Sequence, residues 1–422
     1  MIWDSSLSKI LVITDSIDVQ DSSGSKANVA FIKSLVISGF QVSVFHLTGR
    51  DIALENSQTR NIKELQWTSL FFLSRFQRLF QRYLKIDLSK FLENRFGFSF
   101  TFFNDVNSVK KEFEKIDFSQ ISLVITLSKG ESFRPHKSLL SFPELYSKWL
   151  AYVHDPYPFQ NYPEPYKFIP KGATQKDNFF KQVAAKCRFA GFPSRYLADH
   201  MAAVYGDFLN KQVIIPHQYD SSFKIGELPS FFNKDVFNLV HTGNLIGGRS
   251  PEGLLMGFEL FLKTNPDAKG KVYLHLIGPS GNYDELFAEF LKIEEFLPRA
   301  SVTYSEALAL QNEASVNLII EASETDFSPF LPAKMAHAVY ANKPIFALSP
   351  VKSEVRRLLG SYHKWQSKAN DVTHISKILT SLFESWKANS KQDLKLNRPD
   401  LQTYFSSTYL AQRISNCIED VA

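Results

Sequence analysis

The sequence contains very little cysteine, with only Cys187 and Cys417 among 422 residues. Two thiols so far apart make neither a disulfide framework nor a metal site of the usual spacing, so a reducing compartment is expected. The chain also lacks any uncharged apolar run of about 18 residues, which predicts no transmembrane helix. Its first residues lack the basic segment and long apolar run of a secretory signal. We therefore expect a cytoplasmic protein, with peripheral attachment to the inner face of the cell membrane as a further hypothesis taken up below.

The excess of positive over negative charge is also small: the net charge is +5 and the isoelectric point is near 8.8. Such a mild excess fits anionic ligands or an anionic membrane face but is too weak to indicate a nucleic-acid partner. The sequence has neither a G-x-G-x-x-G nor a Walker motif, which argues against a dinucleotide oxidoreductase and a P-loop kinase. No group of His, Cys and Asp residues has metal-ligand spacing, so no metal and no cofactor are expected.

What the sequence does contain is an alternation of short apolar runs with helical patterns. Continuous apolar runs of this length are typical of strands buried on both faces of a parallel sheet. The alternation predicts the α/β class, with two consecutive Rossmann-like domains. Strands are predicted at 9–14, 41–46, 121–127, 150–153, 188–192, 211–216, 237–241, 271–277, 315–320 and 344–348. Helices are predicted at 27–39, 193–205, 251–262, 284–296, 333–340 and 409–419.

A polar, aperiodic segment at 220–235 marks the boundary between the two domains. We assign 1–220 to an N-terminal Rossmann-like domain and 235–400 to a C-terminal one. The last segment, 401–422, is predicted to hold a helix that packs back toward the N-terminal domain.

Several segments resemble the donor-binding half of the family 4 glycosyltransferases. Residues 241–251 (HTGNLIGGRSP) resemble the family's glycine loop, basic residue and helix start, and 274–278 (LHLIG) its strand ending in glycine. Residues 302–308 (VTYSEAL) resemble a short strand and helix start beside the base, 330–345 the phosphate-contacting helix, and 191–197 (GFPSRYL) a segment near the hinge. The resemblance implies the GT-B architecture, two Rossmann-like domains facing across a cleft, with retention of anomeric configuration and no metal.

The resemblance also implies a donor site in the C-terminal domain. Arg249 and Lys334 would pair with the diphosphate, whose negative charge grows as its bond to the sugar breaks. Each residue also has an alternative without a ligand. Arg249 would be a solvated surface arginine and Lys334 an exposed lysine. The glycines would form an ordinary βα turn, and Asp326 would be a solvated loop carboxylate. The other donor-binding residues implied are Gly243, Asn244, Gly278, Tyr304, Asp326, Ser328 and His337.

The sequence departs from the family at one place in this site. Many members carry two glutamates eight positions apart, and the second holds the donor ribose. Here His337 stands at the second position and the first falls near Ser328. Glu313 and Glu321 have the same spacing but bracket a predicted strand, so we treat that match as chance. His337 is a candidate ribose contact, with a packed or exposed helix residue as the alternative.

Two places in the N-terminal domain are further candidates for the site. A polar loop follows the first predicted strand, and loops at the carboxyl ends of parallel strands bind ligands in such folds. His154 and Asp155 end another strand, where either would hydrogen-bond the transferred sugar or receive the acceptor proton. The alternative for the loop is a flexible turn, and the alternative for His154 and Asp155 is a buried structural pair. The candidate cleft-loop residues are Ser23, Gly24, Ser25 and Lys26.

Residues 70–85 form the strongest amphipathic pattern in the chain. Aromatic and aliphatic side chains fall on one helical face, and cations without any acid on the other. This pattern is typical of a helix that lies at a membrane interface and faces anionic lipid. The alternative is a helix that packs its aromatic face on the domain core. The candidate membrane-facing residues are Phe72, Arg75, Phe76, Arg78, Phe80 and Arg82.

These observations favour a glycosyltransferase that moves a sugar from a nucleotide-sugar donor to a saccharide or lipid-linked saccharide acceptor. The setting would be the assembly of a bacterial surface polysaccharide or glycoconjugate. Two other functions stay open from the sequence. One is a non-catalytic GT-B protein that binds a sugar nucleotide or a partner, which the missing glutamates suggest. The other is a sugar-nucleotide epimerase or hydrolase of the same architecture.

Overall fold

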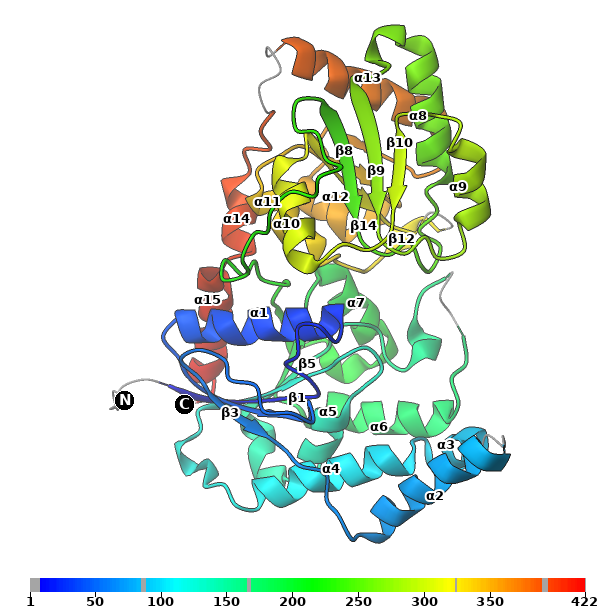
Figure 1. Cartoon of the computed structure of the whole chain (residues 1–422). Helices are drawn as coiled ribbons and strands as arrows, with labels where there is room; N and C mark the ends of the chain where they lie inside the picture. Colours follow the sequence, from blue (N-terminus) through cyan, green and yellow to red (C-terminus); the bar gives the residue numbers. More distant parts are fainter. Residues whose placement is uncertain (1–7, 85–88, 165–167, 323–324, 389–393, 422) are drawn as a thin grey trace. The chain divides into compact units, whose positions relative to one another are not determined.

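The computed structural model describes residues 8–84, 89–164, 168–322, 325–388 and 394–421 (Figure 1). The chain forms two compact units. Unit 1 comprises Met1–Tyr162, Lys167–Gln218 and Phe405–Ala422, and unit 2 comprises Pro163–Tyr166 and Tyr219–Tyr404. Each unit has its own parallel sheet and its own hydrophobic core.

The sheet of unit 1 is parallel throughout, in the order β3-β2-β1-β4-β5-β6-β7. Its central strands are the apolar runs of the sequence and are buried on both faces, as β1 with the sequence KILVIT shows. The edge strand β3, with the sequence QTRN, has no apolar run and was not predicted. The strands are β1 Lys9–Thr14, β2 Gln41–His46, β3 Gln58–Asn61, β4 Leu123–Leu127, β5 Trp149–Tyr152, β6 Phe189–Phe192 and β7 Gln212–Ile214.

Helices cover both faces of this sheet, and one core lies on each face (Figure 1). The last helix of the chain belongs to unit 1, where Leu410, Ile414 and Cys417 enter the core beside β1. It packs on α1, and the hydroxyl of Ser38 donates to the carbonyl of Ser407 at 3.1 Å. The helices are α1 Ser23–Ile37, α2 Ser69–Leu84, α3 Ser89–Phe96, α4 Phe100–Phe113, α5 Arg134–Leu139, α6 Ala173–Lys186, α7 Arg195–Val204 and α15 Ser407–Glu419.

Unit 2 repeats this plan with the sheet order β10-β9-β8-β11-β13-β15, again parallel. A small separate sheet pairs β12 with β14. Its strands are β8 Phe237–Thr242, β9 Val272–Ile277, β10 Phe296–Arg299, β11 Val316–Ile320, β12 Phe327–Ser328, β13 Ile345–Leu348, β14 Lys352–Ser353 and β15 Gln366–Ser367.

The longest helix of unit 2, α13, packs against α8 over glycines. A Cβ on Gly257 would lie 2.5 Å from the side chain of Ile375, so only glycine permits this close approach. Helix α13 was not predicted from the sequence. The helices are α8 Glu252–Thr264, α9 Asp284–Phe290, α10 Tyr304–Glu313, α11 Lys334–Tyr340, α12 Glu354–Leu359, α13 Val372–Ala388 and α14 Pro399–Tyr404.

Each sheet has one point where the strand order reverses. In unit 1 the chain moves outward from β1 through β2 to β3 and then returns to β4 on the other side of β1. In unit 2 the corresponding neighbours are β8 and β11. In open α/β sheets the loops at the carboxyl ends of such strands separate and leave a crevice for ligands. The two reversals therefore define where a site is expected in each unit.

The structure corrects several predicted elements. The helix predicted over 284–296 ends at Phe290, and Phe296 begins the strand β10 instead. The strand predicted around 302–304 is absent from this described part of unit 2, because Thr303 caps α10 with a hydrogen bond from the Glu306 backbone. The predicted end of the amphipathic helix at Lys85 lies outside the described residues. No described helix is long and apolar enough to cross a lipid bilayer.

Candidate functional site

Lys334 stands at the strand reversal of unit 2 as the first residue of α11. Its Nζ lies 3.2 Å from Nε2 of His241, the second-last residue of β8. The Nδ1 of His241 faces the carbonyl of Leu318 at 3.1 Å and donates to it, so Nε2 carries the lone pair that accepts from Lys334. Burial holds the pKa of His241 well below its ordinary value and keeps the ring neutral. The neutral histidine thus positions the lysine at the carboxyl end of β8.

Arg249 supplies a second positive charge beside Lys334. It follows the glycine loop after β8 and precedes α8 by three positions. Within the described part of the chain Arg249 makes no hydrogen bond or ion pair, yet its charge acts on Lys334, His241 and Glu321. Burial, with the charge of Arg249 as the second cause, lowers the pKa of Lys334 to about 7. An anion bound here would relieve that repulsion and stabilise the charged lysine.

Glu321, the first residue after β11, completes this group. It is 3 % exposed, and its Oε1 accepts a 2.7 Å hydrogen bond from the hydroxyl of Ser328. Burial raises the pKa of Glu321 to about 7, against the opposing influence of Ser328 and Arg249. Glu321 was taken from the sequence as a chance match, although its position at the end of a central strand was an available signal.

Two glycines bring the backbone of neighbouring loops into contact at this place. Gly243 and Gly278 follow β8 and β9 with φ values of +131° and +136°. A Cβ on Gly278 would lie 2.6 Å from the carbonyl oxygen of Gly243, and a Cβ on Gly243 would lie 2.8 Å from Nζ of Lys334. A side chain on Gly243 would therefore displace the lysine, and one on Gly278 would collide with the loop after β8, so both positions require glycine.

His337 lies on the same helix as Lys334 and is held by aromatic neighbours. Its Nε2 is 2.8 Å from the hydroxyl of Tyr304, the first residue of α10. The ring of Tyr219 meets His337 edge-on at 5.4 Å and stacks on Tyr340 at 3.9 Å. Burial raises the pKa of Tyr304 and keeps its hydroxyl protonated. The structure thus brings Tyr304 and His337 together, as a pair bonded to each other.

Other donor-site candidates take different positions. Asn244 is exposed in the loop after β8, and Ser328 is buried against Glu321. Asp326 has a side chain that is 78 % exposed and forms an ion pair with Lys368 at 3.0 Å. It lines a cavity of about 490 Å³ whose other lining residues are Pro163, Glu164, Thr325, Phe327, Val351 and Lys352. Neither Arg249 nor Lys334 lines that cavity, and the ion-pair partner of Asp326 is Lys368.

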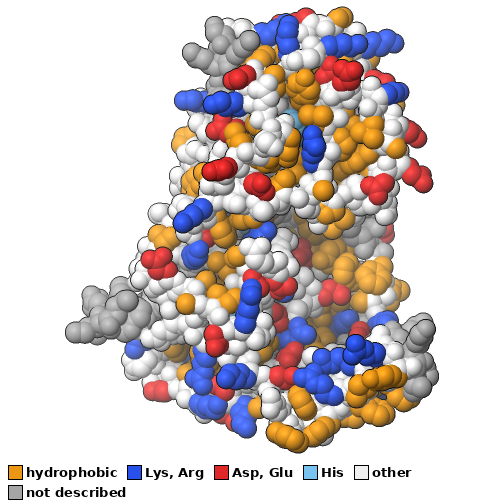
Figure 2. Space-filling model, in the orientation of Figure 1, with side chains coloured by type: hydrophobic (Ala, Val, Ile, Leu, Met, Phe, Trp, Pro, Cys, Tyr) orange, Lys and Arg blue, Asp and Glu red, His pale blue; other side chains and the backbone are white. Residues whose placement is uncertain are grey.

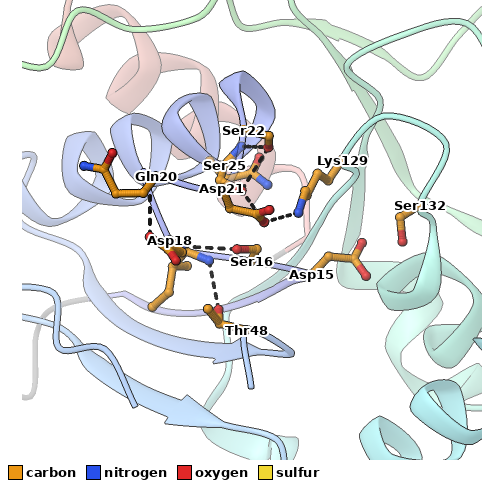
Figure 3. A network of polar contacts seen from close by, with 12 residues as sticks. Asp15, Ser16, Asp18, Gln20, Asp21, Ser22, Ser25, Thr48, Lys129 and Ser132 are labelled. Carbon is orange, nitrogen blue, oxygen red and sulfur yellow. Dashed lines mark hydrogen bonds and ion pairs between the residues drawn. The ribbon is translucent and has the colours of Figure 1, made fainter. Parts of the chain in front are cut away.

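Unit 1 holds an acidic cavity at its own strand reversal, and Figure 3 shows part of its polar network. The cavity measures about 420 Å³ and opens where β1, β2 and β4 end. Arg134 reaches two carboxylates, Asp15 at 3.3 Å and Asp105 at 2.8 Å. The lining residues are Asp15, Ser16, Asp18, Gln20, Asp21, Leu47, Thr48, Asp105, Lys129 and Arg134.

The carboxylates of this cavity differ in their electrostatic surroundings. Burial raises the pKa of Asp15 and raises that of Asp105 to about 6, although Arg134 opposes both shifts. Asp21 lies at the rim, where a hydrogen bond from Lys129 lowers its pKa. None of these residues was a candidate from the sequence, although Asp15 directly follows a predicted strand. Asp105 and Arg134 come from segments without a motif.

The candidate cleft loop is the beginning of α1 and not a loop. Ser22 caps the helix by accepting a 3.1 Å hydrogen bond from the backbone of Ser25, so Ser23, Gly24, Ser25 and Lys26 form its first turn. The reason for the difference is that the serine-rich stretch supplies the cap rather than a turn. This first turn adjoins the acidic cavity, because the hydroxyl of Ser25 lies 3.4 Å from Oδ2 of Asp21.

His154 lies in a buried hydrogen-bond chain beyond β5. Asn28 donates through Nδ2 to Thr14 at 2.9 Å and to the carbonyl of Ser128, so its Oδ1 accepts from Nε2 of His154 at 2.7 Å. The bare Nδ1 of His154 then accepts from Nε2 of His217 at 3.2 Å. Burial lowers the pKa of His217 to about 4 and that of His154 well below its usual value. Both ring nitrogens of His154 are therefore engaged within unit 1.

Asp155, the other catalytic candidate, is partly buried in the turn that follows His154. The structure places the pair beside Ser128, whose hydroxyl accepts a 3.0 Å hydrogen bond from the backbone of His154. Neither residue lines the acidic cavity. Hydrogen bonds within unit 1 therefore fix the orientation of the His154 ring beyond β5.

Solved structures share this fold over the whole chain, whereas no family model and no curated protein sequence matches it. A glycosyltransferase from Rickettsia africae ESF-5 is 12 % identical with a TM-score of 0.61, covering 99 % of both chains. Sucrose-phosphate synthase from Thermosynechococcus elongatus is 12 % identical with a TM-score of 0.63, covering 98 % of both chains. The lipopolysaccharide outer core galactosyltransferase WaaB is 11 % identical with a TM-score of 0.57, covering 97 % of this chain and 99 % of that one. At such identities the likeness establishes the fold, two Rossmann-like domains of the GT-B type.

Proposed function

We propose that the protein is a glycosyltransferase that takes a sugar from a nucleotide-sugar donor held in unit 2. The observation that carries this proposal is the pair of cations at the strand reversal, Arg249 and Lys334, beside the glycine-lined ends of β8 and β9. A departing nucleoside diphosphate needs fixed positive charge where its negative charge grows. The two cations supply it without a metal, and we propose retention of anomeric configuration as in the resembling family.

The remaining donor contacts follow from the same geometry. The backbone at Gly243 and Gly278, which carries no side chain, is proposed to approach the diphosphate closely. Tyr304 and His337 are proposed to face the ribose, in place of the carboxylate that the family carries. Glu321, half-protonated near neutral pH, would accept or donate a hydrogen bond to a sugar hydroxyl. If no nucleotide binds to unit 2, these assignments are wrong as well.

We further propose that the acceptor is a saccharide or lipid-linked saccharide, bound to unit 1 at an anionic membrane surface. The amphipathic helix α2 supports this, because its aromatic face stays outside the core. Phe76 is 58 % exposed, Tyr83 is 76 % exposed and Trp67, just before the helix, is 82 % exposed. The alternative of core packing would have buried these side chains. Figure 2 shows hydrophobic and basic side chains side by side over this part of unit 1.

Charge on the same helix matches an anionic lipid surface. Arg78 and Arg82 are exposed, and neither forms an ion pair in the described part of the chain. Arg75 is the exception, because it pairs with Glu64 at 2.7 Å. Aromatic side chains settle at the depth of the lipid headgroups, and each basic residue near them adds about 1 kcal/mol of attraction to anionic lipid. A peripheral enzyme of polysaccharide or glycoconjugate assembly would use such a face.

Nucleotide binding to the full-length protein tests the donor site. Thermal shift is measured with UDP, GDP and their sugar conjugates, because a ligand of the native state raises the melting temperature by mass action. The expected result is a shift with one nucleotide family that Arg249→Ala abolishes. Lys263→Ala, which removes an exposed cation of α8, is the matched control and should keep the shift.

Turnover assays then separate the enzyme classes. A transferase releases free nucleotide from the donor only when an acceptor is added, whereas a hydrolase or epimerase consumes the donor alone. Nucleotide binding without turnover would indicate a non-catalytic binding protein, the alternative that the absent glutamate pair suggests. The absence of any nucleotide shift would overturn the donor site.

A further inference from the structure

The acidic cavity of unit 1 has the position and the chemistry of a second ligand site. It lies where the strand order reverses between β1 and β4, the place where open α/β sheets bind ligands. Its lining comes from segments far apart in the sequence, since Asp15 follows β1, Thr48 follows β2 and Lys129 follows β4. Asp105 of α4 and Arg134 of α5 close the inner side.

The charges that line this cavity leave it negative. Its four carboxylates, Asp15, Asp18, Asp21 and Asp105, face two lining cations, and Arg50 pairs with Asp18 from outside the lining, so the carboxylates outnumber the cations by one. Both cations are already bound, Lys129 to Asp21 and Arg134 to the two inner aspartates. A phosphate or carboxylate entering the cavity would meet repulsion and would have to break these ion pairs.

One buried oxygen in the cavity lacks a partner. Asp15 is 7 % exposed, and while its Oδ1 accepts from Arg134, its Oδ2 makes no hydrogen bond to the described part of the chain. A buried carboxylate oxygen without a hydrogen bond is costly, and a donor group on a ligand would remove that cost. Figure 3 shows Asp15 between Ser16 and Ser132, on the side of the network away from Asp18.

We infer that this cavity holds the ring of an acceptor sugar that presents hydroxyl or amino groups to Asp15 and Asp105 and carries no phosphate or carboxylate there. A sugar ring fits a cavity of about 420 Å³ and brings several O–H donors at fixed spacing. A protonated amine would in addition neutralise part of the excess negative charge. The identification of the ligand as an acceptor rests on the proposed function, whereas the binding of such a sugar rests on the cavity alone.

Binding of matched sugars to the full-length protein tests this inference. The probes are glucose, galactose and mannose, their 2-amino forms and their 6-phosphates, measured by calorimetry and saturation-transfer NMR with UDP present. We expect the amino forms to bind at least about tenfold more tightly than the phosphates. Asp15→Asn and Asp105→Asn should each reduce the ratio of amino-sugar affinity to sugar-phosphate affinity, because each variant removes one negative charge beside the amine.

A control and a second variant keep the test decisive. Asp117→Asn removes a carboxylate of unit 1 outside the cavity and should leave the ratio unchanged. If Asp15→Asn does not fold, Asp18→Asn at the rim replaces it, with the same direction of effect. Equal or tighter binding of the phosphates, binding of no probe, or Mg²⁺ binding that Asp105→Asn abolishes would each overturn the inference. UDP binding in the same samples reports separately on the donor site, so failure of one proposal is not read as failure of the other.

Discussion

Lys334 is expected to make nucleotide affinity depend on pH. Its pKa is lowered to about 7 by burial and by Arg249. A bound diphosphate stabilises the ammonium form and raises that pKa in the complex. Between the two values the free lysine is mostly neutral and must take up a proton when the nucleotide binds. Affinity therefore falls as the pH rises through this window.

The size of the effect follows from the protonated fraction of free Lys334. That fraction is about one half at about pH 7 and roughly 3 % at about pH 8.5, if the pKa in the complex returns to about 10.4, the ordinary lysine value. UDP affinity should then fall about fifteenfold over this range, or about 1.6 kcal/mol. The phosphates contribute little to the change, since their last ionisation is nearly complete above about pH 7.

Glu321 titrates in the same window and must be separated from Lys334. Its pKa is raised to about 7, so its ionisation as the pH rises adds a negative charge near the diphosphate and also weakens binding. Lys334→Met should bind UDP more weakly at neutral pH and should lose the part of the pH slope that belongs to the lysine. The double variant with Glu321→Gln should bind UDP with no slope.

Calorimetry in buffers of different ionisation enthalpy measures both affinity and proton uptake. Wild-type protein should take up a proton on binding UDP above neutral pH, Lys334→Met should take up only the smaller amount that belongs to Glu321, and the double variant should take up none. Lys263→Met is the matched control, because it removes an exposed lysine of α8 and should behave as wild type. An unchanged pH slope in Lys334→Met would refute the placement of this lysine against the diphosphate.

Three further predictions concern packing, membrane contact and the buried histidine chain. Gly278→Ala should cost roughly 1–3 kcal/mol of stability and lower the melting temperature, because its Cβ would meet the carbonyl of Gly243 at 2.6 Å and its φ of +136° disfavours other residues. Phe76→Ser with Arg78→Glu should weaken binding to anionic liposomes by about tenfold or more at unchanged melting temperature, measured by co-sedimentation. Asn28→Leu should destabilise unit 1 by roughly 1–3 kcal/mol in chemical denaturation, because it leaves the buried polar groups of Thr14 and His154 without their hydrogen-bond partner.

Each of these predictions has a matched control and an opposing outcome. Gly270→Ala keeps a positive φ of +70° but meets nothing within 4 Å, so it isolates the backbone strain from the clash. Equal losses of stability in Gly270→Ala and Gly278→Ala would contradict a contribution from the close approach of Gly278 to Gly243. Ile246→Ser removes an exposed apolar side chain of unit 2 and should leave liposome binding unchanged. A misfolded Phe76→Ser variant would instead favour core packing of α2, and an unchanged unfolding midpoint for Asn28→Leu would contradict the hydrogen-bond chain.

The two-domain α/β fold was predictable from the sequence because its central strands are local features. Runs such as Lys9–Thr14 and Phe237–Thr242 are buried on both faces and are therefore apolar at consecutive positions. The edge strand Gln58–Asn61 and the short strand Phe296–Arg299 lack that signal and were missed. The cap at Ser22 was misread as part of a loop, because serine and glycine serve turns and helix starts equally well.

Within the candidate site, the sequence by itself determined the two cations and the glycines that follow strands, since strand ends and loop composition are local. Only the tertiary structure decided which side chains meet. It paired Asp326 with Lys368, placed Glu321 where the charge of Arg249 acts on it, and joined Asp15, Asp105 and Arg134 from three distant segments into one cavity. It also placed the aromatic face of α2 in solvent, where the helical pattern alone left core packing open. The physical reason is that periodicity in the sequence indicates which face of a helix or strand is apolar. Which element packs against that face depends on how segments far apart in the chain are brought together.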